Sequence, residues 1–231
     1  MNNKKKILLL AYNMSPYRGS EFSVAWNYLT HMSEEHEFYV LYGTSSGEFN
    51  ETSEMNNFLE KHELKNTHFF DIKIKNTKTI QFLIFLFKHR WGNHLPYYFI
   101  YRHWHKEAYK KALNIIEKEE IDLIHYLNPI GIKEPGFLWK IKKPYIWGPI
   151  STGIKHPLHL TTKWKYKFFL ALRDFSQKII FKKHLRVKKA IKNADLVLAA
   201  TGTSKHSLEK AYHKSFLYIP ENGIVKIKRE H

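Results

Sequence analysis

Short apolar runs alternate along this chain with longer stretches whose apolar residues recur at helical spacing. Runs of this kind are typical of strands buried on both faces of a parallel sheet. Strands that alternate with helices predict a doubly wound α/β domain with right-handed crossovers. We therefore expect a Rossmann-like, mostly parallel sheet of about seven strands with helices on both faces. The predicted strands cover residues 5–12, 37–42, 67–74, 121–127, 144–147, 194–200 and 215–219.

The stretches between these runs are predicted to be helical. The first helix opens at Ser20, whose hydroxyl can cap it, and Glu21 lies favourably in its first turn. Residues 159–192 are predicted to form one long basic helix. The other predicted helices cover residues 51–63, 79–91, 97–118, 135–141 and 204–212. Because no internal repeat or low-complexity linker divides the chain, we expect residues 1–220 to form a single domain.

The composition limits the chemistry that the chain can perform. A formal net charge of +17 on 231 residues usually indicates an anionic partner, although surface lysines alone would also produce it. The absence of cysteine excludes disulfides, thiolate metal ligands and a cysteine nucleophile. The 15 histidines are not accompanied by an HExxH motif or a paired acidic cluster, and GxGxxG is absent after the first strand. We therefore expect no metal site and no bound dinucleotide.

The carboxyl ends of the strands are the expected ligand-binding edge of such a sheet. The loop after the first strand leads directly into a helix, and the free N–H groups at a helix start bind phosphates and carboxylates. Gly19 and Ser20 lie at this predicted helix start, which makes them candidates for anion binding. The alternative is a plain strand-to-helix turn. The loops expected at this edge follow Tyr12, Leu127, Trp147 and Ala200.

These loops carry pieces of one known pattern. The sequence reads SPYRGSEFSVAW over residues 15–26, IHYLNP over 124–129, PYIWGPISTG over 144–153, NADLVLAAT over 193–201 and IPENGI over 219–224. In these pieces, their order and their spacing, the chain resembles the N-terminal, acceptor-side domain of family-four glycosyltransferases. Those are retaining enzymes with two facing Rossmann-like domains, the GT-B architecture. The resemblance covers nearly the whole chain and implies hexose transfer from a nucleotide-diphosphate sugar, without a cofactor.

The resemblance also implies roles for single residues. The amides of Gly19 and Ser20 would face the diphosphate of the donor. His125 would hydrogen-bond the transferred sugar and stabilise charge near the anomeric carbon, whereas a lone histidine in a strand is otherwise usually a core residue. Retention in this family is attributed to same-face attack assisted by the leaving phosphate, so no obligatory carboxylate pair is expected in this half.

A further group of residues is expected to line the acceptor side or the interdomain cleft. Trp147 is equally well explained by core packing, and Arg18 could pair with a phosphate of the donor or of the acceptor. The group consists of Tyr17, Arg18, Asn128, Trp147, Thr152 and Gly153.

The chain departs from the family pattern in its first loop and in its length. Relatives usually read GSEPGVGW there, whereas this chain has Phe22, Ser23 and Ala25 at the changed positions, which makes the helix start bulkier. In such enzymes the IPENGI piece leads into a second domain that binds the nucleotide. We therefore interpret residues 221–231 as the stub of the interdomain connection, with the donor domain missing. The isolated chain is expected to be inactive or weakly active.

The basic segment 151–192 holds twelve Lys or Arg residues against a single acid, Asp174, with aromatic residues interleaved. This pattern is typical of an interfacial membrane helix, although a crossover helix with a solvated basic face would have the same pattern. The residues expected to face an anionic membrane are Trp164, Lys165, Lys167, Lys178, Lys182 and Lys183. The aromatic run 82–87, with Lys88 and Arg90 after it, is a candidate for a second anchor.

Together these features predict glycosyl transfer to a lipid-linked or polysaccharide acceptor at the cytoplasmic face of the cell membrane. The chain would be peripheral there, because its longest apolar run is too short to span a bilayer. The alternative is a non-catalytic, membrane-associated partner subunit or the remnant of a truncated glycosyltransferase. Nucleic-acid binding is not expected, since no helix-turn-helix, RRM or zinc pattern is visible.

Overall fold

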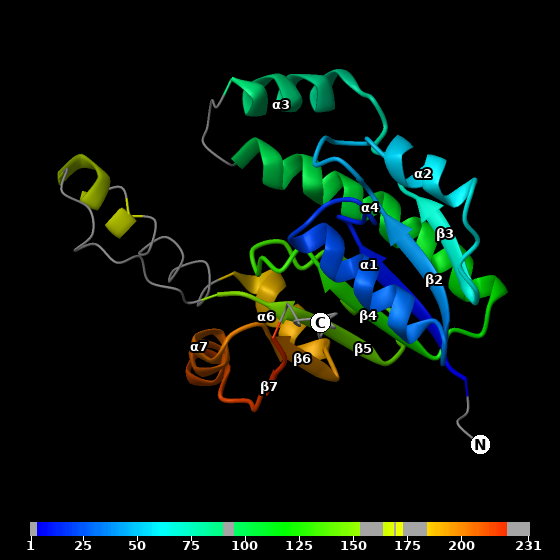
Figure 1. Cartoon of the computed structure of the whole chain (residues 1–231). Coiled ribbons are helices and arrows are strands. Elements are labelled where there is room, and N and C mark those ends of the chain that lie inside the picture. Colours follow the sequence, from blue (N-terminus) through cyan, green and yellow to red (C-terminus); the bar gives the residue numbers. More distant parts are fainter. Residues whose placement is uncertain (1–3, 90–94, 153–163, 169, 173–183, 221–231) are drawn as a thin grey trace, which may run out of the picture.

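The computed structural model describes residues 4–89, 95–152, 164–168, 170–172 and 184–220. In these residues seven strands form one sheet in the order β3-β2-β1-β4-β5-β6-β7, and every neighbouring pair is parallel (Figure 1). The strands are β1 (Lys6–Ala11), β2 (Glu37–Tyr42), β3 (Thr67–Asp71), β4 (Leu123–Asn128), β5 (Tyr145–Ile150), β6 (Leu196–Ala199) and β7 (Leu217–Tyr218). The predicted parallel α/β, Rossmann-like sheet is confirmed.

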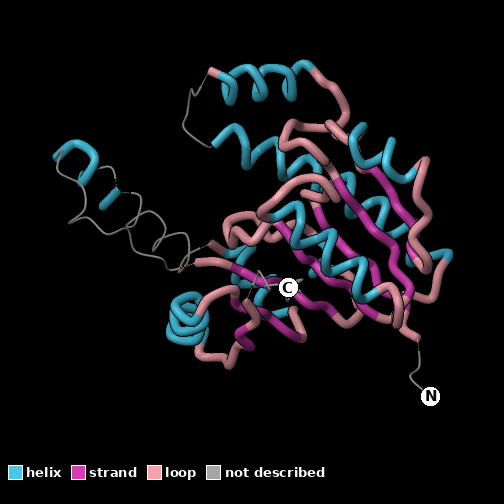
Figure 2. The backbone as a smooth tube through the Cα atoms, in the orientation of Figure 1, coloured by secondary structure: helices cyan, strands magenta, loops and turns pink. Residues whose placement is uncertain are grey.

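Helices cover both faces of the sheet, as the tube drawing shows (Figure 2). They are α1 (Glu21–Met32), α2 (Ser53–Leu59), α3 (Lys78–Lys88), α4 (Leu95–Lys118), the 3-10 turn η1 (Leu138–Lys140), α6 (Leu185–Asn193) and α7 (Gly202–Tyr212). Among the helices of the described ranges, none is both long and apolar enough to cross a bilayer.

Alternate residues of the central strands are buried in one of two apolar layers. In β1, Leu9 packs in a cluster with Leu29 of α1 and Met55 of α2. Leu8 faces the other way, into a larger cluster that includes Trp104 of α4 and residues of α6. Side chains of a strand alternate between the faces of its sheet, so a strand buried on both sides is apolar at every position.

The sheet changes direction between β1 and β4. The chain winds from β1 outward through β2 to β3, returns over the opposite face, and continues with β4 on the other side of β1. Ligands of doubly wound sheets bind at the carboxyl ends of the strands at such a switch point. The SPYRGSEFSVAW piece begins in the loop after β1, and the IHYLNP piece ends just after β4, so both pieces contribute to this point.

Helix α4 runs antiparallel to the strands and makes the return crossover. Near its end, Glu119 accepts a hydrogen bond from Lys6 at the start of β1, at 2.8 Å. Nearer its beginning, the ring of Tyr101 lies 4.8 Å from the ring of Tyr12, just after β1. The first turns of α4 therefore lie at the carboxyl edge of the sheet, which is also the edge of the switch point.

The prediction of one helix over residues 159–192 is wrong. Residues 164–168 and 170–172 are helical, but His184 is extended (φ −73°, ψ 102°) and begins α6 as its N-cap. Its Nδ1 accepts the N–H of Val187 at 3.3 Å, so a new helix starts where the prediction continued the old one. The rest of 159–183 and the predicted stub 221–231 lie outside the described residues.

Candidate functional site at the switch point

The start of α1 lies at the carboxyl edge of β1, with Gly19 and Ser20 exposed in front of it. The predicted cap by the Ser20 hydroxyl is wrong: Ser20 has φ 58° and ψ −139°, and its side chain makes no capping hydrogen bond. The first N–H groups of any α-helix lack an intrahelical partner, and the helix dipole is positive at this end. A Cβ atom at Gly19 would meet no other atom within 4 Å, so the space beside this exposed position is open. The geometry suits an anion.

Asn128 and Glu21 hold this helix start against β4. The Asn128 amide donates to the carbonyl oxygens of Asn13 (2.8 Å) and Glu21 (3.0 Å), and its Oδ1 accepts the N–H of Asn13 (3.1 Å). The Glu21 carboxylate accepts the side-chain amide of Asn13 at 2.9 Å and the N–H of Ile130 at 3.2 Å. Both side chains therefore connect the loop after β1 to the loop after β4. Asn128 is 1% exposed, and its predicted acceptor-side role stays a prediction.

His125 lies within β4 and is 3% exposed. Its Nε2 donates to the carbonyl oxygen of Gly148 at 2.9 Å, so its Nδ1 is the acceptor for the Tyr28 hydroxyl at 3.1 Å. Burial lowers the pKa of His125 to about 4, so the ring is neutral at pH 7. This environment is that of a core histidine, the alternative weighed from the sequence. Contact with a sugar stays a prediction.

Trp147 is also buried, at 1% exposure, and packs in the layer opposite His125. Its ring stacks on that of Tyr126 at 6.0 Å, the arrangement expected of a core residue. Thr152, further along the same chain segment, contacts the start of α7. Its N–H donates to Ser204 Oγ at 3.0 Å, and Ser204 Oγ donates to the Thr152 carbonyl oxygen at 2.9 Å.

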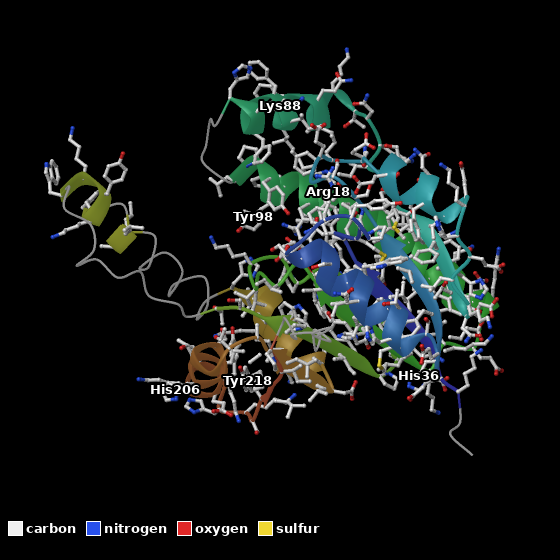
Figure 3. The ribbon with its side chains drawn as sticks, in the orientation of Figure 1. Arg18, His36, Lys88, Tyr98, His206 and Tyr218 are labelled. Atoms are coloured by element: carbon white, nitrogen blue, oxygen red, sulfur yellow. The ribbon has the colours of Figure 1, made fainter. Side chains whose placement is uncertain are left out.

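Arg18 projects from the first loop at the end of the molecule that carries α3, whereas His36 lies at the opposite end (Figure 3). The Nε and Nη2 atoms of Arg18 donate to the two carboxylate oxygens of Glu54, both at 3.1 Å. The guanidinium thus already has an anionic partner, and an incoming phosphate would compete with Glu54. Tyr17 is 65% exposed and lies edge-on to Phe58 of α2.

A buried ion pair holds the loop after β4 from the other side. Arg186 of α6 donates to both carboxylate oxygens of Glu134, at 2.8 and 2.6 Å, and to the carbonyl oxygen of Gly136 at 2.9 Å. The carbonyl oxygen of Glu134 accepts the Tyr126 hydroxyl at 3.1 Å. His105 lies beside Tyr126, and burial lowers its pKa to about 3. These residues fix the course of the loop that presents Ile130 to Glu21.

The remaining predicted residues are not brought to the switch point by the described structure. Trp164 is 71% exposed, and Lys165 and Lys167 are exposed in the same helical piece, 164–168. Gly153, Lys178, Lys182 and Lys183 lie outside the described residues. In the ranges that the structure describes, no group of three or more His, Cys, Asp or Glu side chains could hold a metal ion.

Comparison with known proteins identifies a distant structural likeness. No protein-family model matches the sequence, and no curated protein matches it. Among solved structures, the chain is similar to HepE of Anabaena in complex with UDP, with a TM-score of 0.38 and 14% sequence identity. The match covers 93% of this chain and 43% of HepE, so the chain spans less than half the length of that protein. A likeness at this level carries no functional argument.

Proposed function

We propose that this chain is the acceptor-side half of a retaining, GT-B-type hexosyltransferase that uses a nucleotide-diphosphate sugar. One observation carries the proposal: the piece SPYRGSEFSVAW forms an open helix start at the switch point of a parallel Rossmann-like sheet. Sequence resemblance associates this piece with a donor diphosphate, and the geometry of a free helix start is suited to bind one.

In the proposed site the diphosphate oxygens accept hydrogen bonds from the amides of Gly19, Ser20 and the first turn of α1. The clamp of Asn128 and Glu21 supports catalysis by fixing these donors in advance, since preorganised donors need not reorient as charge develops. A contact between His125 and the transferred sugar requires Tyr28 to release Nδ1, because both ring nitrogens are bonded. A second domain would bind the rest of the nucleotide.

We further propose a lipid-linked or polysaccharide acceptor and a peripheral position at an anionic cytoplasmic membrane face. The net charge of +17 and the exposed aromatic side chains of residues 164–168 support this part of the proposal. Anionic lipid attracts lysine and arginine, and exposed aromatic rings favour the interface between headgroups and acyl chains.

The proposal is tested by measuring the binding of UDP-glucose to the isolated chain. Broadening of the ³¹P resonances of the ligand reports that binding. We expect a dissociation constant on the order of 1 mM. Gly19→Asp should abolish the broadening, because it adds a negative charge at the helix start. Gly19→Asn is the matched control: it adds a side chain of the same size without charge and should bind as the wild type does. Equal broadening by the wild type and Gly19→Asp would refute the site, as would no broadening by the wild type.

A further inference from the structure

We infer that the outer face of α3 and the first turns of α4 bind the surface of an anionic lipid bilayer. We call this surface the α3–α4 face; it consists of Phe82, Phe85, Leu95 and Phe99, with Lys78 and Lys88 at its margins. The inference deepens the proposed function by naming the lipid class and the surface. The binding of this surface to lipid does not depend on the proposed function. Only the purpose of that binding rests on it.

The inner face of α3 is fully used in packing. Ile80 is 3% exposed, and Leu83 and Ile84 pack against the large core cluster. The ring of Phe87 lies 5.6 Å from that of Phe49 and 5.8 Å from that of Tyr97. Thr77 caps the helix by accepting the N–H of Ile80. Helix α3 is therefore firmly attached to the domain through its inner face.

The outer face of α3 carries large apolar side chains among the polar residues Lys78, Gln81 and Lys88. Phe82 is 59% exposed and Phe85 46%, and at the start of α4 Leu95 is 63% and Phe99 50% exposed. Figure 1 shows α3 as the outermost element at its end of the molecule. Exposed aromatic and aliphatic side chains that lie among cationic residues mark an interaction site rather than an ordinary solvated surface.

The charge around this face identifies the occupant. Between Asp71 and Glu107 the sequence contains no acid but seven Lys or Arg residues. In the described part of this stretch, Lys73 pairs with Asp71 at 3.2 Å, whereas Lys78 and Lys88 have no ion pair. Anionic headgroups satisfy such cations while the rings between them enter the acyl boundary. A protein groove would satisfy the rings but would need its own acids around them.

The position of the α3–α4 face fits an acceptor that is carried by lipid. Since α4 begins at the carboxyl edge of the sheet, this face lies at the same edge as the switch point. Figure 3 shows Lys88 of α3 and Tyr98 of α4 at the end of the molecule where Arg18 projects. A bilayer bound there would bring the headgroup region toward the start of α1.

The first test is co-sedimentation with vesicles of phosphatidylcholine alone, or mixed with an equal amount of phosphatidylglycerol. The wild type should bind only the mixed vesicles, and Phe82→Gln/Phe85→Gln should reduce that binding at least about tenfold. Leu113→Gln is the matched control, because Leu113 is 43% exposed on α4 but lies beyond the first turns that belong to the face. Lys78→Glu/Lys88→Glu should also lose binding, whereas Lys61→Glu/Lys65→Glu, the same charge change at exposed positions elsewhere, should lose much less.

The second test measures insertion directly and uses the absence of native cysteine. An environment-sensitive fluorophore on Gln81→Cys, beside Phe82, should shift to the blue when phosphatidylglycerol vesicles are added. The same label on Lys61→Cys should not shift. Undiminished binding by the double phenylalanine variant, an equal shift at both labels, or no binding to mixed vesicles would overturn the inference. Neither test contains a nucleotide sugar. Failure of the membrane-binding inference is therefore distinguishable from failure of the proposed transferase function.

Discussion

At the scale of single residues, two buried histidines make the fold sensitive to acid. His125 and His105 have pKa values lowered by burial to about 4 and about 3, against 6.5 for the free side chain. Between these values and 6.5 the unfolded chain binds protons that the folded chain does not, so stability falls as pH falls. We expect each histidine to account for a loss of about 2–3 kcal/mol in the free energy of unfolding between about pH 7 and pH 4.5.

Urea unfolding of His125→Gln at both pH values checks this prediction. Glutamine can hydrogen-bond Tyr28 and Gly148 but does not titrate in this range, so the acid loss of the variant should be smaller by about 2–3 kcal/mol. An acid loss equal to that of the wild type would show that His125 is not held neutral.

The ion pair of Arg186 and Glu134 should matter far more than that of Arg18 and Glu54. The side chains of the first pair are 19% and 7% exposed, and those of the second 43% and 28%. Arg186→Met leaves a buried carboxylate without its partner and should cost about 3–5 kcal/mol of unfolding free energy. Arg18→Met, the same substitution in the exposed pair, should cost at most about 1 kcal/mol. Equal losses, measured by urea unfolding, would contradict these assignments.

Residue roles were the hardest feature to predict from the sequence, because they depend on partners far along the chain. Glu134 and Arg186 are 52 positions apart, and nothing in either local sequence indicates their pairing. The burial of His125 depends on Tyr28, 97 positions away. The sequence did place Glu21 favourably in the first turn of the first helix. However, its bond to Ile130 could not be foreseen before the strand order was known.

At the scale of elements, the helix starts at Thr201 of α7 and Ser20 of α1 should respond differently to mutation. Thr201 caps α7 by accepting the N–H of Ser204 at 3.0 Å, so Thr201→Ala should cost about 1 kcal/mol. Ser20 caps nothing and has a positive φ, which glycine adopts more readily, so Ser20→Gly should be neutral or stabilising by up to about 1 kcal/mol. Thermal unfolding measures both. A larger loss for Ser20→Gly than for Thr201→Ala would contradict the observed geometry.

Element type followed well from the local pattern, whereas some boundaries did not. The predicted strand 37–42 coincides with β2, and the predicted helix 97–118 differs from α4 by two residues at its start. The long basic helix was wrong because charge and helical spacing continue through residue 184, where the His184 side chain satisfies a backbone N–H and begins a new helix. The spacing of apolar residues in the sequence does not show where one helix ends and the next begins.

At the scale of the whole molecule, the strand order explains why the predicted site pieces meet. The hydrogen bonds between the loop after β1 and the loop after β4 join residues that are 107 or more positions apart in the sequence. Parallel pairing of β1 with β4 brings the two loops to one edge of the sheet. That edge was predictable from alternation alone. His125 and Trp147 lie in opposite layers because β4 and β5 pair Tyr126 with Trp147, a register that the sequence alone does not give.

The central claim is that the open start of α1 at the switch point binds the diphosphate of a nucleotide sugar. The most direct measurement is a titration of the ¹⁵N-labelled protein with UDP-glucose, followed through the backbone amide resonances. The account predicts saturable shifts in residues 19–23 and at Ile130, with His36 and its neighbours at the opposite edge unchanged. Shifts confined to the opposite edge, or none at millimolar ligand, would contradict it.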